Sequence, residues 1–147
     1  PVGRTAVLDT AAFVNGGDGA PRNRVALLQA FETVGTAERF SVVVNHLKSK
    51  GSACDAPDAG DGQGNCSDVR TAAARELATW LQRDPTGTGD PDVLIVGDLN
   101  SYSLEDPVRL LTEAGYANLV KEFAGGDAAG YVFAGQWGNL DHALATQ

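Results

Sequence analysis

Several features are scarce or missing in this chain. Its 147 residues contain no methionine, and the chain begins at Pro1. We therefore expect a processed product, an expressed fragment or a stretch of a longer protein, with no signal peptide left to read. No run of 18 apolar residues is present, which argues against a helix that crosses a membrane.

Positive charge is also in short supply. Eleven basic and 19 acidic side chains give a net charge of −8. This balance excludes a protein that binds nucleic acid through a broad basic surface. It still allows an enzyme that meets phosphates through bound cations, because such ions supply positive charge locally. With 43% apolar residues, the chain is long enough for one soluble globular domain.

Two cysteines are present, and both lie within a polar, glycine-rich loop over residues 51–67. Cys54 and Cys66 form no CxxC motif. An even pair closing a loop of this length favours a disulfide, and with it an exported protein. Two free thiols in a cytosolic protein, or part of a metal site, remain as alternatives.

The segment 91–102 organises the chain. Four apolar β-formers at 93–96, between Pro91 and Gly97, predict a short strand buried on both faces. It delivers Asp98 and Asn100 to its carboxyl end. If the extended backbone continues, these side chains share one face and suit a hydrated metal ion, an attacking water or a phosphate oxygen. The alternative is an Asx turn that merely ends the strand.

A hairpin is predicted upstream, with strands within 22–32 and 40–47 joined by a turn at 35–39. Antiparallel pairing would bring Arg24 and His46 to the same end of the sheet. A single histidine after a run of valines is more often structural than catalytic.

The polar and basic neighbours Asn45 and Lys48 favour a functional reading of His46, as a donor to a phosphoryl oxygen or a proton carrier. Lys50 is expected to be an ordinary solvated charge.

The remaining elements follow from periodicity. A helix is predicted over Val69–Gln82, capped by Ser67 or Asp68 and packed on the sheet without a chemical role. A second helix is predicted over 105–115, with Pro107 in its first turn and Gly115 as its terminator. Further predicted segments are strand-like stretches at 2–14, 131–133 and 140–145, with a turn at 15–19.

Asp141 and His142 are neighbours in the last of these segments. Adjacent side chains on a strand point to opposite faces, so at most one of the two can face Asp98. An aspartate flanked by apolar residues would be a partly buried carboxylate, which needs a partner.

Three motifs in this order carry a family resemblance: 45–50 (NHLKSK), 97–102 (GDLNSY) and 140–145 (LDHALA). They resemble the endonuclease/exonuclease/phosphatase superfamily, which has the DNase I-like fold. Together with 60–66 and 135–138 they look closest to its bacterial extracellular nuclease branch. The resemblance spans nearly the whole chain from Arg24 onward.

The resemblance implies an α/β (α+β) fold, part of a four-layer α/β/β/α sandwich with mixed, largely antiparallel sheets. It also implies a divalent-metal-dependent phosphodiesterase. In such an enzyme His46 contacts the scissile phosphate, and Asp98 and Asn100 orient the water and the phosphate or metal. Asp141 helps to position the nucleophile or a metal, and Arg24 resembles a phosphate-contacting arginine.

The predicted catalytic residues are therefore His46, Asp98, Asn100 and Asp141, and the predicted phosphate-binding residues are Arg24, Asn45 and Lys48. Asp98 and Asn100 are the predicted metal ligands, with Mg²⁺ favoured over Ca²⁺ or Mn²⁺. The predicted substrate is nucleic acid, DNA before RNA, and the predicted location is outside a bacterial cell. No obligate protein partner is expected, and the lack of an exposed aromatic or apolar hairpin argues against a membrane substrate.

The chain also departs from the family. No stretch before Arg24 matches the family's metal-binding asparagine and glutamate, and Asp141-His142 lacks the serine of its terminal Ser-Asp-His motif. We interpret Asp141 as part of the preceding strand and His142 as structural, with a degenerate terminal motif as the alternative. Residues 1–147 are then the middle to carboxyl-side portion of one domain, without the amino-terminal strand and the terminal Ser-Asp-His strand. A phospholipid or small-phosphoester hydrolase of this fold, and a non-catalytic truncated module, remain as alternatives.

Overall fold

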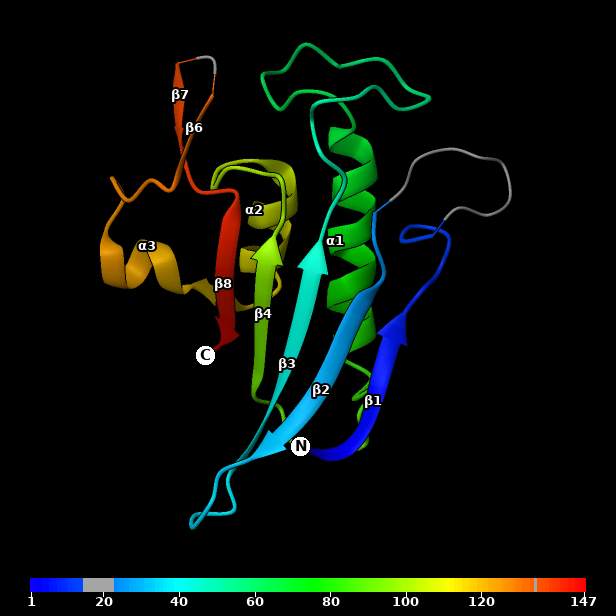
Figure 1. Cartoon of the computed structure of the whole chain (residues 1–147), viewed down its shortest axis with the longest axis vertical. Coiled ribbons are helices and arrows are strands. Elements are labelled where there is room, and N and C mark those ends of the chain that lie inside the picture. The colour runs from blue at the N-terminus through cyan, green and yellow to red at the C-terminus, as the bar shows by residue number, and fades with distance from the viewer. Residues whose placement is uncertain (15–22, 134) are drawn as a thin grey trace.

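The computed structural model describes residues 1–14, 23–133 and 135–147 (Figure 1). The predicted turn at 15–19 lies outside these ranges. The described elements are, in chain order, β1 (Val2–Leu8), β2 (Ala26–Glu32), β3 (Arg39–His46), α1 (Ser67–Leu81), β4 (Val93–Asp98), α2 (Asp106–Glu113), β5 (Tyr116–Asn118), α3 (Leu119–Ala124), β6 (Tyr131–Phe133), β7 (Gln136–Gly138) and β8 (Asp141–Thr146).

Six of these strands form one sheet in the order β1-β2-β3-β4-β8-β5. Strands β3 and β4 are parallel, with α1 in the connection between them, and the other four neighbouring pairs are antiparallel. A parallel pair needs such a crossover, whereas β2 and β3 need only the predicted short turn. The expected mixed, largely antiparallel sheet is confirmed.

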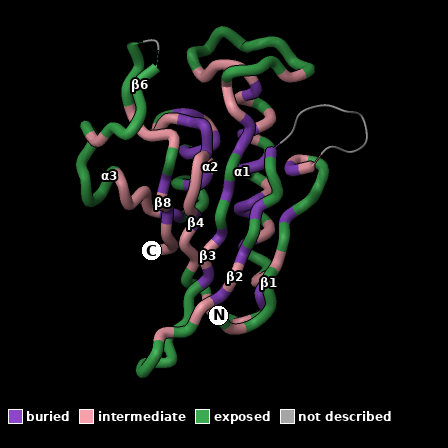
Figure 2. Tube along the Cα trace, viewed as in Figure 1, coloured by how far each residue is buried: buried purple, intermediate pink, exposed green. Residues whose placement is uncertain are grey.

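The two faces of the sheet differ in burial. Helices α1 and α2 lie behind the sheet in Figure 1 and cover one face, where Val43, Ile95 and Leu144 are fully buried. Figure 2 shows buried and less buried residues alternating along the strands. On the other face, Leu27 and Val44 remain 46% and 52% exposed. The 93–96 segment is therefore fully buried only towards the helices, and the described residues form one helix layer and one sheet layer of the predicted sandwich.

The helix ends depart slightly from the prediction. Helix α1 begins at Ser67, so its N-cap is Cys66, whose φ of 63° lies in the left-handed region and whose side chain makes no capping bond. The predicted capping role of Ser67 or Asp68 was wrong because Cys66, bonded to Cys54, occupies the N-cap. Helix α2 begins with Pro107 in its first turn, as predicted. No helix in the described part of the chain is long and apolar enough to cross a bilayer.

A small hairpin, β6–β7, projects from the end of the molecule near the start of β8 (Figure 1). Phe133 and Trp137 are 65% and 61% exposed. This overturns the expected lack of an exposed aromatic hairpin. The apolar side chains alternate between the two sides of a two-stranded ribbon, and no described layer covers either side.

Strand β4 depends on a glycine just before its last residue. Gly97 pairs with Asn45 on one side and with His142 on the other. Its φ is +123°, and a Cβ atom would lie 2.1 Å from the Asn45 carbonyl oxygen. Only glycine fits a strand that approaches its neighbour so closely.

We expect Gly97→Ala to lower the free energy of unfolding by about 3 kcal/mol or more, because a backbone clash adds to an unfavourable φ. Gly87 is a matched control, since its φ of +72° is also positive but nothing lies within 4 Å of its Cβ position. Gly87→Ala should therefore cost only about 1 kcal/mol. Urea unfolding measures both values, and equal losses would contradict the proposed clash.

Candidate functional site

Three predicted site residues lie in one row across the sheet. His46 is the register partner of Asp98 on β4, and Asp98 is the partner of Asp141 on β8. Register partners project to the same face of a sheet. His46 follows Val44 by two residues, so the row lies on the face that the helices leave open. The His46 Nε2 and Asp98 Oδ2 atoms are 3.5 Å apart, and both side chains remain accessible to solvent.

The backbone does not stay extended beyond the row. Strand β4 ends at Asp98, and Asn100 has a left-handed φ of +48°. The Asn100 backbone N–H donates to Asp98 Oδ1 over 2.8 Å, which is the Asx turn considered as the alternative. The turn does not remove Asp98 from the site. It orients the carboxylate through Oδ1, while Oδ2 lies towards His46.

Asn100 itself is tethered. Its Nδ2 donates to the Leu47 carbonyl over 3.0 Å, and the residue is 7% exposed. This bond links the end of β4 to the residue after His46. Because Nδ2 is used in this bond, the Asn100 side chain offers its Oδ1 atom as a hydrogen-bond acceptor.

The predicted basic residues gather near His46. The backbone N–H of Arg24 donates to the His46 carbonyl over 3.2 Å, and the residue is exposed. The expected convergence of these two residues at one end of the sheet is confirmed. The Lys48 ammonium donates to Ser52 Oγ over 2.7 Å, so it is held within its own loop. Burial lowers the pKa of Lys48, and the Arg70 and Arg24 guanidinium groups lower it further.

Two polar residues lie on the opposite, helix-covered face. Asn45 is 2% exposed, and its Nδ2 donates to the Val43 carbonyl. The phosphate contact predicted for Asn45 does not fit this placement, because adjacent residues on a strand point apart and His46 takes the open face. His142 is 4% exposed on the same covered face, with its Nε2 2.7 Å from the Ser101 carbonyl oxygen.

Sequence reasoning missed the role of Arg70, because it gave this helix no chemical role. This α1 side chain is fully buried, and its guanidinium donates to Ser101 Oγ and to the carbonyls of Lys48, Asn65 and Gln63. Glu105 lies 4.0 Å from it. A buried guanidinium needs several acceptors, and here they come from the loops that follow β3 and β4. An arginine in the first turn of the helix, followed by a threonine and three alanines, was the available signal.

Lys50 is likewise not the solvated charge that was expected. It forms an ion pair with the buried Glu105, and its ammonium lies 4.6 Å from the centre of the Tyr102 ring. A cation over an aromatic face is an attractive arrangement. Tyr102 in turn packs against Gly138 of β7, where a Cβ would lie 2.7 Å from the ring. Lys50 and Tyr102 therefore join the 48–52 segment to the hairpin.

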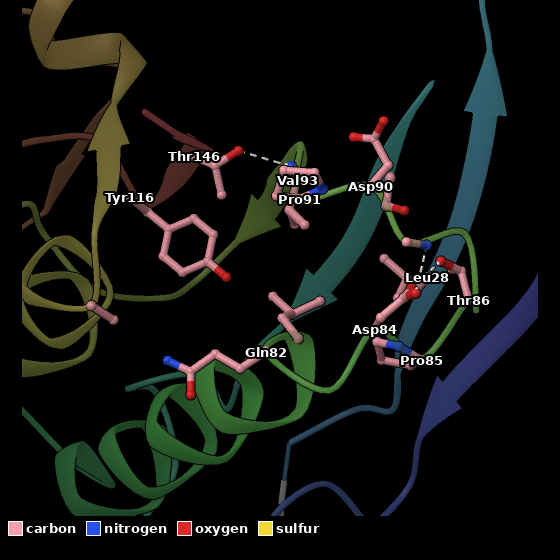
Figure 3. Close-up of a pocket in the computed structure, with 14 residues that line it drawn as sticks. Leu28, Gln82, Asp84, Pro85, Thr86, Asp90, Pro91, Val93, Tyr116 and Thr146 are labelled. Carbon is pink, nitrogen blue, oxygen red and sulfur yellow. Dashed lines mark hydrogen bonds between the residues drawn. The ribbon is translucent and has the colours of Figure 1, made fainter. Parts of the chain in front are cut away.

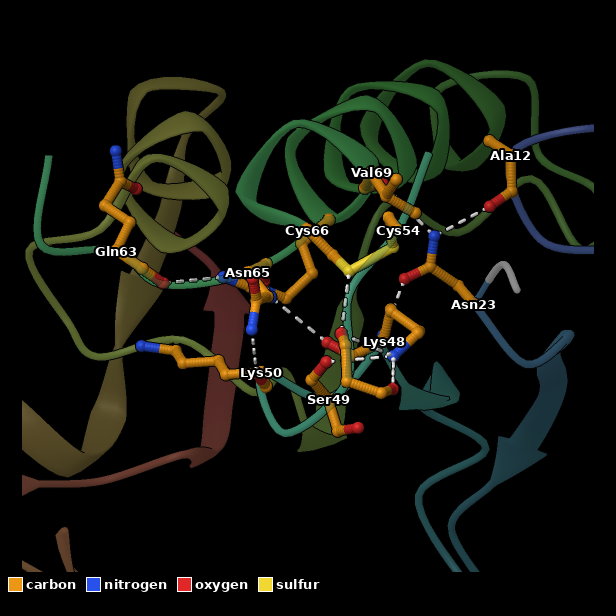
Figure 4. The surroundings of a disulfide bond; sticks show 12 residues. Ala12, Asn23, Lys48, Ser49, Lys50, Cys54, Gln63, Asn65, Cys66 and Val69 are labelled. Atoms are coloured by element: carbon orange, nitrogen blue, oxygen red, sulfur yellow. Dashed lines mark hydrogen bonds between the residues drawn. A yellow bond between two sulfur atoms is a disulfide. The ribbon is translucent and has the colours of Figure 1, made fainter. Parts of the chain in front are cut away.

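The loop between β3 and α1 is closed by the predicted disulfide, Cys54–Cys66 (Figure 4). Asn65 Nδ2 donates to the Lys50 carbonyl over 3.0 Å. Asn23 supports the loop from the other side, because its Oδ1 accepts from the Lys48 backbone and its Nδ2 donates to the Ala12 carbonyl. The disulfide and these amides hold the segment after His46 in place.

The donor set suits part of a metal site. Asp98 and Asp141 face each other across β4 and β8, where two like charges repel and a cation would stabilise them. In the described residues no group of three or more histidine, cysteine, aspartate or glutamate side chains is placed to hold a metal. Mg²⁺ often binds through one or two carboxylates and keeps several waters, so this pair fits as a partial set.

A cavity of about 350 Å³ lies at the other end of the sheet, among Leu28, Gln82, Val93, Tyr116 and Thr146 (Figure 3). Val93 begins β4 and Thr146 ends β8, so this cavity is separated from the row by the length of the strands. It contains none of the predicted site residues.

Comparisons with known proteins give the fold. No family model matches the chain, and no curated protein matches it. Among solved structures it is similar to the human Nocturnin catalytic domain (TM-score 0.63, 18% identity, covering 98% of this chain and 47% of that chain). It is also similar to a mannosyl-6-phosphatase from Bacteroides thetaiotaomicron (TM-score 0.60, 12% identity, 87% and 45%) and to a Staphylococcus aureus beta toxin with bound magnesium ions (TM-score 0.51, 14% identity, 83% and 42%).

The chain has the DNase I-like fold of the endonuclease/exonuclease/phosphatase proteins, as the motifs predicted. It spans less than half the length of the solved structures that it resembles. The activity, substrates and partners of a whole protein of this kind are therefore matters for proposal.

The burial of His142 predicts a dependence of stability on pH. Burial lowers its pKa from 6.5, opposed by the Ser101 and Asn139 carbonyls. Below pH 6.5 the unfolded chain therefore takes up a proton that the folded chain does not, and the free energy of unfolding falls. One such proton contributes at most about 1.4 kcal/mol per pH unit.

We expect His142→Gln to reduce the loss of thermal stability between pH 7 and pH 5. The unaltered chain, measured under the same conditions, is the reference. If His142→Gln loses as much thermal stability between pH 7 and pH 5 as the unaltered chain, His142 is not the group responsible.

Proposed function

We propose that this chain forms part of a divalent-metal-dependent phosphodiester hydrolase, an extracellular bacterial nuclease that cleaves DNA and, by the same chemistry, RNA. The observation that carries the proposal is the row of His46, Asp98 and Asp141 on the open face of the sheet. The row combines an imidazole with two carboxylates in a setting open to a large substrate. The motif resemblance and the DNase I-like fold point to the same class of reaction.

Each side chain has a role that its contacts suit. His46 donates a hydrogen bond to a phosphoryl oxygen and stabilises its developing negative charge. Asp98, held through Oδ1 by the Asn100 backbone, accepts a proton from the attacking water at Oδ2. Asp141 helps to orient that water from the neighbouring strand. Arg24, exposed beside the end of β3, contacts the phosphate.

The proposed cofactor is Mg²⁺, held in part by the Asp98 and Asp141 carboxylates. When bound, the ion supplies positive charge for the phosphoryl oxygens. Asn100 keeps Asp98 in position through its backbone and its bond to Leu47. The set is partial in this chain, and further ligands would come from a longer domain.

The proposed extracellular location rests on the disulfide. Cys54–Cys66 closes the loop that carries Lys50, and disulfides persist in oxidising compartments. The beta toxin comparison is compatible with this location.

A second candidate keeps the fold and reaction but takes a phospholipid headgroup or another small phosphoester as substrate. The exposed β6–β7 hairpin favours it, because apolar side chains at the edge of a site can contact a lipid surface. The names of the mannosyl-6-phosphatase and the toxin show that this fold is not confined to nucleases. No phosphodiester hydrolysis by either the chain or the full-length product of its gene would instead favour a non-catalytic module.

We expect Asp98→Asn to lower the rate of magnesium-dependent plasmid nicking by roughly 10²–10⁴-fold, because an amide cannot accept the proton from water. EDTA should abolish nicking and Mg²⁺ should restore it. The assay uses both this chain and the full-length product of its gene.

Asp92→Asn is the matched control. Asp92 is an exposed aspartate just before β4, at the end of the strand away from the row. It should leave the rate unchanged. A change below tenfold for Asp98→Asn in an active protein would refute the role given to Asp98.

A further inference from the structure

The β6–β7 hairpin is an uncharged apolar surface. Residues 131–138 (YVFAGQWG) include no charged side chain. Tyr131 and Phe133 lie on one side with their ring centres 6.5 Å apart, whereas Val132 and Trp137 are register partners and share the other side. Large apolar groups exposed on both sides of so short a ribbon are unusual unless they bind something.

A cavity of about 370 Å³ lies at the base of this hairpin. Its lining includes Tyr102, Leu104, Gln136, Trp137 and Asn139. The volume falls within the range of small-molecule sites, about 300–1,000 Å³. The position of Tyr102 is set by its packing on Gly138, by the Lys50 ammonium over its ring and by its hydroxyl 3.5 Å from the Gln136 carbonyl oxygen.

Two short segments of the chain connect the cavity to the row of His46, Asp98 and Asp141. Tyr102 follows Asp98 by four residues, and Trp137 precedes Asp141 by four. Four residues of extended chain span at most roughly 13 Å, so both aromatic residues lie within one or two nucleotides of a phosphate bound at the row. A group that enters the cavity would therefore belong to the same substrate molecule as that phosphate.

The chemistry of the lining favours a flat aromatic ring over a lipid chain. Insertion into a membrane needs only projecting apolar side chains, whereas this hairpin carries a cavity at its base beside a cation–aromatic pair. Aromatic side chains stack on nucleobases of any sequence once the bases are unpaired.

We infer that the cavity between Tyr102 and Trp137 binds an unpaired nucleobase next to the scissile phosphate, so that single-stranded nucleic acid is the preferred substrate. This inference rests on the proposed nuclease function and narrows its substrate. A base inside a duplex is stacked on its neighbours and does not reach the cavity without unpairing.

The test measures binding without hydrolysis, in EDTA, by the anisotropy of labelled probes. The probes are a single-stranded oligothymidylate, an oligonucleotide of equal length with tetrahydrofuran residues in place of nucleotides, and a duplex. Trp137→Ala should weaken binding of the oligothymidylate about tenfold or more, within the range of one lost stacking contact. Binding of the base-free strand should not change, because it makes no stacking contact.

Two variants serve as controls. Trp137→Phe should restore most of the binding, because it keeps an aromatic face. Phe123→Ala removes an aromatic residue that is 79% exposed on α3 and does not line the cavity, and it should have no effect. Both positions are on the surface, and the melting temperature of each variant confirms that it is folded.

The inference is overturned if the unaltered protein binds the base-free strand or the duplex as tightly as the oligothymidylate, or if Trp137→Ala weakens all probes alike. It is also overturned if Trp137→Ala leaves oligonucleotide binding intact but abolishes binding to phosphatidylcholine–sphingomyelin vesicles, which would identify a lipid surface. A protein that binds bases through Trp137 yet cleaves no phosphodiester would refute only the proposed hydrolase function. One that cleaves DNA with Trp137→Ala unaffected in binding would refute only this inference.

Discussion

The parallel pairing of β3 with β4 is the constraint on which the candidate site depends. Its register sets His46 opposite Asp98, and the antiparallel pairing of β4 with β8 adds Asp141 to the same row. A shift of one residue would turn every one of these side chains to the wrong face. Gly97 permits the close approach of the two strands, since any Cβ there would meet the Asn45 carbonyl. Gly97 therefore keeps the three residues of the row in register.

Beyond the ends of β3 and β4, the buried guanidinium of Arg70 holds the following loops in position. Arg70 donates to the loops that follow both β3 and β4, and its charge is balanced by Glu105. Removal of one partner from such a buried ion pair commonly costs about 3–5 kcal/mol, because the remaining charge is left uncompensated. Lys50 binds the same Glu105 and its ammonium lies over the Tyr102 ring, so one connected set of contacts supports the row of His46, Asp98 and Asp141 and the base of the hairpin.

The open face of the sheet unites the two proposals. The helices cover the face that carries Asn45 and His142, and the other face leaves the row of His46, Asp98 and Asp141 accessible to solvent. Phosphate chemistry would take place at the strand ends, where the backbone leaves polar side chains exposed. The β6–β7 hairpin lies beside these strand ends and would bind a nucleobase of the same substrate. Reaction and recognition are then separated in space but connected through Tyr102.

The sequence by itself determined the hairpin of β2 and β3, both longer helices, the disulfide and the identity of the motifs, because local periodicity, turn residues and cysteine spacing encode them. It also determined that Asp141 and His142 point apart, since that follows from the period of a strand. Only the tertiary structure decided that Asn45 is buried, that Asn100 begins a turn, and that Arg70 is an internal cation. These outcomes depend on contacts between segments distant in the chain, and no local pattern states which face a helix will cover or which loop will supply a buried charge with its acceptors.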